Sequence, residues 1–154
     1  MKRLTCVFAI VLAAITTAPV IADSDARSVT GAGKGLFGDG AALGAVALQG
    51  LELGTGVFIE ADGSASGTFH ATLQGSSLGV AREITVEGKV SEGSVGADGR
   101  ATFSGTASLD LGDGAPALPG VAFSVTAGAD GLVLSIDSTT LPAAGLASGA
   151  VTIE

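Results

Sequence analysis

Residues 100–111 read Arg-Ala-Thr-Phe-Ser-Gly-Thr-Ala-Ser-Leu-Asp-Leu, and polar and apolar side chains alternate through the whole stretch. Successive side chains of a β-strand point to opposite faces of a sheet, so this period of two predicts a half-buried strand. The polar face carries Thr, Ser and Asp and would meet water. The apolar face consists of Ala101, Phe103, Gly105, Ala107, Leu109 and Leu111.

The same alternation recurs on both sides of this stretch. It runs through residues 65–74, 83–91, 121–127 and 132–136, and a last apolar pair stands at Val151 and Ile153. Residues 43–54 are apolar but interrupted by glycine, so strands are expected there, although a short helix at 41–48 fits the same letters. The chain therefore carries about eight predicted strands.

The connections between these strands have the composition of turns. Ala-Asp-Gly occurs at residues 61–63, 97–99 and 129–131, each time between two alternating runs. The Asp side chain can cap a turn and Gly can take positive φ, so three hairpins are predicted. The longer connection Gly112–Gly120 holds Pro116 and Pro119 and is expected to cross between sheets or to rim a barrel end. It is the best candidate for a binding loop.

The first 22 residues have the features of an export signal. Lys2 and Arg3 give a positive start, residues 4–15 form an apolar run, and Val20-Ile21-Ala22 has the small-residue spacing of a cleavage site. We expect cleavage after Ala22, and a bacterial protein that is secreted or periplasmic and has no membrane span in its mature form.

Strands with one apolar face each must bury that face against another layer. The sequence therefore predicts an all-β protein: an antiparallel β-sandwich of about eight strands, with a small closed β-barrel as the alternative. Residues 41–154 are expected to form a single domain, and residues 23–40 a flexible glycine-rich lead. The only cysteine, Cys6, lies in the export signal, so the domain must be stabilised by packing without disulfides.

Composition narrows the possible partners. Export would remove two of the seven basic residues and none of the fifteen acidic ones, leaving a net charge of −10. This acidic balance argues against nucleic acid and anionic lipid, which both attract basic surfaces. Phe is present without Trp or Tyr, so the aromatic girdles of outer-membrane barrels and the stacking surfaces of base-binding proteins are both missing.

Two glycine-containing stretches match the letters of catalytic or cofactor motifs. Residues 33–38 fit a dinucleotide fingerprint, which needs a preceding strand and a following helix in a parallel sheet. Residues 75–79 fit a nucleophile elbow, which needs a strand-to-helix turn and a histidine later in the chain. The only histidine, His70, comes earlier. We interpret the first match as chance and the second as a hairpin turn.

The remaining titratable residues also favour structural interpretations. His70 is flanked on its strand face by Thr and Ser, which predicts a solvent-facing side chain. Asp110 and Asp113 could offer oxygen ligands to Ca²⁺, but Asp-Gly after a strand is ordinary turn chemistry, and the calcium question stays open. Glu83 and Glu87 share an outer strand face and are expected to be solvated. No catalytic, cofactor-binding or metal site is predicted.

Residues 101–107, followed by residues 123–126 and Asp130, resemble the central stretch of post-COAP-type domains, all-β modules of secreted bacterial proteins. The similarity covers residues 67–134. The Asp-Asn-Gly-x-Pro run that the family would place near Asp130 is absent. The resemblance implies a surface or extracellular β-domain and carries over no functional residue.

Together these features predict an exported, non-enzymatic β-domain that binds a cell-surface, matrix or polysaccharide partner. Its contact surface would be loop Gly112–Gly120 or a Ser/Thr face. That face consists of Thr68, Thr72, Thr102, Ser104, Thr106 and Ser108. The alternative is a structural component whose edge strands assemble copies into a coat. An enzyme would need His70 and an acidic residue in a concave pocket, and a carrier would need a hollow barrel lined by Phe.

Overall fold

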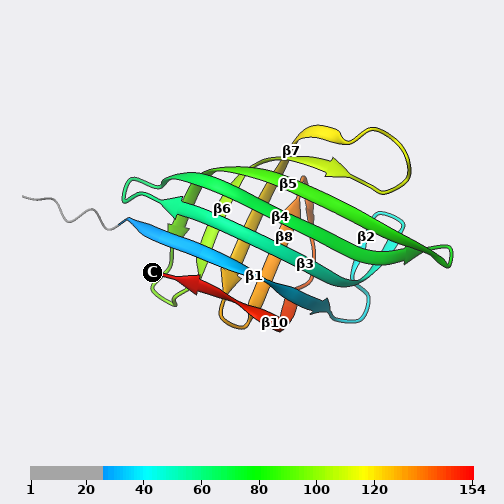
Figure 1. Cartoon of the computed structure of the whole chain (residues 1–154), viewed down its shortest axis with the longest axis horizontal. Helices are drawn as coiled ribbons and strands as arrows, with labels where there is room; N and C mark the ends of the chain where they lie inside the picture. The colour runs from blue at the N-terminus through cyan, green and yellow to red at the C-terminus, as the bar shows by residue number, and fades with distance from the viewer. Residues whose placement is uncertain (1–25) are drawn as a thin grey trace, which may run out of the picture.

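The computed structural model describes residues 26–154. The expected export signal and residues 23–25 of the expected lead lie outside this part. The described residues form ten antiparallel strands without a helix, so the all-β prediction is confirmed (Figure 1). No helix that could cross a membrane occurs within residues 26–154. The strands are β1 (Arg27–Phe37), β2 (Ala42–Leu43), β3 (Val46–Ile59), β4 (Ser64–Ser77), β5 (Val80–Val95), β6 (Ala101–Asp110), β7 (Leu118–Gly128), β8 (Gly131–Ile136), β9 (Thr139–Thr140) and β10 (Ala144–Ile153).

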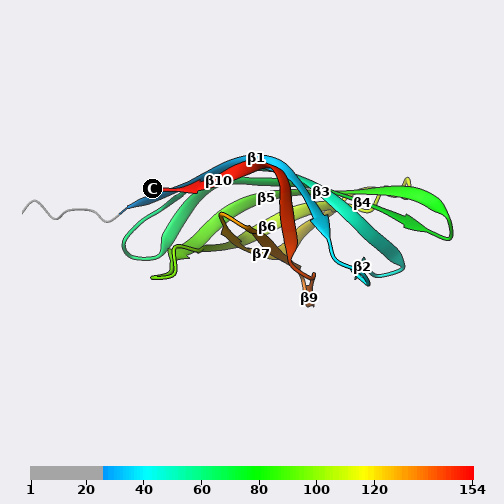
Figure 2. The same cartoon turned by 90° about the horizontal axis from the view of Figure 1, so that it is seen from below.

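The strand pairings return to their starting point. From β1 they run through β3, β4, β5, β6, β7 and β8 to β10, which pairs with β1 again. The link between β8 and β10 consists of only two residue pairs, Ala144 with Leu132 and Gly145 with Gly131. Figure 2 shows β1, β10 and β3 as an arch above β6, β7 and β9. The sheet therefore folds over into the two layers of a sandwich-like structure.

The space between the layers is filled by the predicted apolar faces. Strand β6 buries Ala101, Phe103, Ala107 and Leu109, as its alternation requires. The ring of Phe69 in β4 stacks on that of Phe123 in β7, with ring centroids 5.7 Å apart, and Phe103 lies 6.0 Å from Phe69. No polar or charged residue is buried in the described part of the chain. Apolar burial is thus the main stabilising term.

The expectation of a flexible lead over residues 23–40 is wrong for residues 27–37, which form strand β1. This strand lies between β3 and β10 and pairs with both along most of its length. Its small residues let the neighbouring backbones approach, because a Cβ on Gly31 would lie only 2.8 Å from the carbonyl oxygen of Ala150. Val29 adds a fully buried side chain. Hydrogen bonds to two neighbours thus order a stretch with few large side chains.

The predicted turns are found where the sequence places them. The three Ala-Asp-Gly tripeptides join β3 to β4, β5 to β6 and β7 to β8. The Oδ1 atoms of Asp62 and Asp98 accept backbone N–H groups two residues further on, at 2.9 Å from Ser64 and 3.1 Å from Arg100. The short helix considered for residues 41–48 is not formed, because this segment is a hairpin between β2 and the start of β3.

The connection Gly112–Gly120 does not cross between sheets, which corrects that part of the prediction. It joins β6 to β7, and these strands pair directly with each other. Strand β7 begins at Leu118, so the last residues of the predicted loop belong to the sheet. The connection therefore lies at one end of a single layer.

Candidate functional site

His70 lies on the outer face of β4, as its Thr-rich surroundings predict. Its side chain is 52% exposed, and its Nδ1 atom lies 4.0 Å from Oε1 of Glu87 on β5. Its Nε2 atom is 3.4 Å from the hydroxyl of Thr72. An open hollow of about 670 Å³ surrounds this region of β4, β5 and β6. No hydrogen bond joins a serine to the imidazole among the described residues.

The two glycine motifs are parts of the sheet. Residues 33–37 belong to strand β1, and no helix follows them in the described chain, which agrees with a chance match. Residues 75–79 are the end of β4 and the turn to β5. Leu78 and Gly79 both have positive φ, at 51° and 78°, so the second motif is the predicted hairpin turn.

The carboxylates of Asp110 and Asp113 stabilise the chain beside them. Oδ1 of Asp110 accepts the N–H of Gly112 at 2.9 Å, and Oδ1 of Asp113 accepts the N–H of Ala115 at the same distance. Both are the local Asx interactions expected of turn residues.

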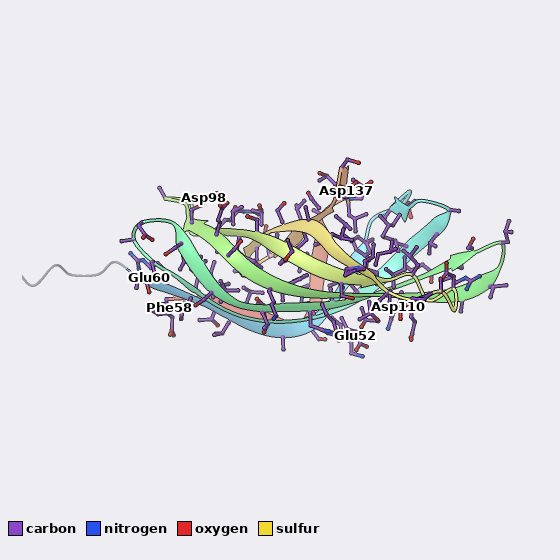
Figure 3. The ribbon with its side chains drawn as sticks, turned by 90° about the horizontal axis from the view of Figure 1, so that it is seen from above. Glu52, Phe58, Glu60, Asp98, Asp110 and Asp137 are labelled. Carbon is purple, nitrogen blue, oxygen red and sulfur yellow. The ribbon has the colours of Figure 1, made fainter. Side chains whose placement is uncertain are left out.

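The acidic residues are dispersed over the molecule. Figure 3 shows Glu60 and Asp98 toward one end, Asp110 toward the other, and Glu52 and Asp137 on opposite faces. No group of three or more His, Cys, Asp or Glu side chains within residues 26–154 converges as a metal site would require. Glu83 and Glu87 are exposed on the outer face of β5, as predicted. The acidic residues of this part thus form a solvated surface.

Two acidic side chains have local partners that affect their ionisation. The Lys34 ammonium on β1 hydrogen-bonds Glu52 on β3 and holds the pKa of that carboxyl below its ordinary value. The Ser64 hydroxyl and N–H similarly lower the pKa of Asp62 in the β3–β4 turn. Both sites are exposed, so these interactions are screened by water and salt.

A leucine-lined cleft of about 680 Å³ opens at one end of the molecule, between β2 and β3 on one side and β5, β6 and β7 on the other. Strand β6 ends at Asp110, and Leu109 and Leu111 on either side of that residue both line the cleft. Loop residue Asp113 and the flanking residue Leu118 stand at its rim. The apolar lining comes from Leu43, Val46, Ile84, Leu109, Leu111, Leu118, Val121 and Ile136.

Exposed apolar side chains gather at this same end. Six large hydrophobic residues are exposed among the described ones, and four of them are Leu78, Val80, Leu111 and Leu118. Leu78 and Val80 form the tip of the β4–β5 hairpin, which adjoins the cleft through Ser77. The Arg82 guanidinium on this hairpin donates to the carbonyl of Gly112 at 2.8 Å. We call the cleft together with Leu78 and Val80 the apolar end.

The interior is not the Phe-lined hollow that a carrier would need. Phe69, Phe103 and Phe123 pack against one another and are at most 3% exposed. None of these three residues lines the cleft at the apolar end. Sequence reasoning indicated loop 112–120 as a binding loop but missed Leu43 and Val46, which carry no signal beyond their place in an apolar run.

The chain was compared with protein-family models, curated proteins and solved structures. No protein-family model matches it, and the searches of curated proteins and of solved structures found no match. The similarity to post-COAP-type domains therefore stays a prediction.

Proposed function

We propose that this chain is an exported, non-enzymatic β-domain that acts by binding an apolar group of a surface or matrix partner at its apolar end. The observation that carries the proposal is the leucine-lined cleft with Leu111 and Leu118 left exposed at its mouth, 36% and 50% respectively. Exposed apolar patches on soluble domains mark interaction sites. The volume of about 680 Å³ lies within the range of small-molecule sites.

The cleft lining favours an apolar chain over a saccharide as its occupant. Eight Leu, Val and Ile side chains contribute to the lining, together with the charged residues Arg82, Asp113 and Asp137. An aliphatic cleft stabilises a hydrocarbon chain or apolar peptide side chains by removing both surfaces from water. The signal-like first 22 residues support an extracytoplasmic site of action.

Titration with Nile red, an uncharged dye that fluoresces in apolar surroundings, tests the proposal. We expect saturable binding that Leu118→Asp weakens at least tenfold, because the substitution places a carboxylate at the cleft mouth. The matched control is Phe58→Asp, which also replaces an exposed apolar side chain by a carboxylate; Phe58 is 46% exposed and lies on β3, away from the cleft. Because the dye is uncharged, the added charge does not act on it directly.

The control variant should bind the dye like the unmodified protein. Absence of saturable binding to the unmodified protein would overturn the proposal, as would equal binding by the Leu118→Asp variant.

A self-assembling structural role is a second candidate, and one observation favours it. The edge of β10 that faces away from β1 pairs with β8 only at Ala144 and Gly145, so residues 147–153 have no strand on that side within the described chain. Figure 1 shows β10 in red along the lower border of the molecule, with β1 beside it. Open strand edges can pair with further copies.

Sedimentation equilibrium over a range of concentrations tests this second candidate. Glu154 and Ser28 of β1 form two backbone hydrogen bonds with each other, so the N–H of Glu154 points toward β1. Successive residues of a strand direct their N–H groups to opposite edges, and the N–H of Ile153 therefore points toward the open edge. The Ile153→Pro variant should therefore remain folded and lose any concentration-dependent assembly. If the unmodified protein has the mass of a monomer at all concentrations, the structural role is eliminated.

A further inference from the structure

The outer face of β4, β5 and β6 carries polar side chains in three aligned rows. Strand register places Thr68 opposite Lys89 and Lys89 opposite Thr106. The next row consists of His70, Glu87 and Ser108, and a third consists of Thr72, Thr85 and Asp110. None of these nine residues is buried.

The first two rows line a hollow rather than a flat surface. The open space of about 670 Å³ is bordered by all six of their side chains and by Pro119 and Gly120 at the start of β7. Gly88, between Glu87 and Lys89, borders the hollow as well. Leu118 of the apolar end immediately precedes Pro119, but the two cavities share only Gly120 among their lining residues. The hollow is therefore a second, chemically different cavity.

The groups around the hollow can both donate and accept hydrogen bonds. Thr68, Thr106 and Ser108 supply hydroxyls, Lys89 donates, and Glu87 accepts. One carboxylate and one ammonium balance each other, so the hollow does not select a strongly charged ligand. Polyhydroxylated chains have the matching chemistry, because every sugar hydroxyl is itself a donor and an acceptor. The ring of Pro119 offers an apolar contact for the carbon face of a sugar ring.

The repeat of the rows fits a chain better than a single small molecule. Rows on one face of a strand recur every second residue, or roughly 6.6–6.8 Å. The third row continues the same pattern beyond the hollow. We propose that this face binds a segment of a neutral polysaccharide, with Glu87, Lys89 and Thr106 at the centre of the contact.

Retention of the purified protein in native gels cast with neutral polysaccharides tests the proposal. The probes are soluble β-glucan, dextran, xylan and hydroxyethyl cellulose, each compared with a gel that lacks polysaccharide. We expect at least one of them to retard the protein. The combined variant Glu87→Ala with Thr106→Val should lose at least tenfold in apparent affinity for that polysaccharide, because it removes a carboxylate acceptor and a hydroxyl from the hollow.

Thr30→Val is the matched control, because Thr30 is also an exposed threonine on the outer face, on β1 outside the hollow. This control should be retarded like the unmodified protein, and the combined variant should still bind Nile red. Retardation by none of the four polysaccharides would overturn the proposal. Equal retardation of the combined variant and the unmodified protein would overturn it too.

Discussion

The ring of Phe123 in β7 lies directly against Gly88 in β5, so closely that a Cβ atom on Gly88 would stand 2.6 Å from the ring carbons Cε1 and Cζ. The same ring stacks on Phe69 of β4 across the interior. Gly88 thus leaves the space that the Phe123 ring occupies against β5. The backbone of β5 also forms the floor of the outer hollow at this position.

Gly88→Ala should destabilise the fold. The added methyl group overlaps a buried ring that is stacked on Phe69, and overpacking of this kind lowers the free energy of unfolding by about 1–3 kcal/mol. Urea unfolding followed by circular dichroism measures the change. The control is Gly56→Ala on β3, where a Cβ would meet nothing within 4 Å. It should be neutral or slightly stabilising, and equal stability of the two variants would refute the packing argument.

Leu78→Asn should stabilise the β4–β5 hairpin. Leu78 has a φ of 51°, in the left-handed region that disfavours branched side chains, and its side chain is fully exposed, so it has no packing to lose. Asn-Gly is the preferred pair for a two-residue turn with two positive φ angles. We expect a gain of about 0.5–1 kcal/mol in the free energy of unfolding. Leu78→Ala, which removes the leucine without supplying a turn residue, should not reproduce the gain.

Acid should weaken the contact between Lys34 and Glu52. Because the pKa of Glu52 is lowered in the folded protein, its contribution to stability is fully present above the ordinary value of 4.5 and is lost as the pH falls through the lowered value. The free energy of unfolding, measured by urea unfolding at a series of acidic pH values, should therefore fall less steeply with decreasing pH for Glu52→Gln than for the unmodified protein. Lys34→Met should have the same effect, and 1 M salt should reduce the difference. Unchanged slopes in both variants would contradict the assignment.

Export should remove the first 22 residues. Intact mass spectrometry of the protein recovered outside the cytoplasm is expected to give a chain that begins at Asp23, since Val20-Ile21-Ala22 has the spacing of a cleavage site. Ala22→Pro should block this cleavage and leave a longer, retained precursor. Recovery of the whole chain, starting at Met1, from the extracytoplasmic fraction would exclude the proposed processing.

The candidate sites were only partly accessible to sequence reasoning. The exposure of His70 and the turn roles of Asp110 and Asp113 follow from their neighbours in the chain, and the structure confirms these predictions. The apolar end was missed because Leu111 continues the inner-face alternation of β6. The strand stops at Asp110, and the same leucine lies just beyond it, where it lines the cleft and is 36% exposed.

By itself the sequence determined the local features of this protein: the strands that alternate polar and apolar residues, the face of each that is buried, and the three Ala-Asp-Gly turns. These depend on side-chain periodicity and backbone preference, which act over a few residues. Only the tertiary structure decided that residues 27–37 form a strand, that β10 closes onto β8 through two residue pairs, and that rows of polar residues align across β4, β5 and β6. Strand pairing and register join residues far apart in the chain, and hydrogen bonds between uniform backbones leave no trace in local composition.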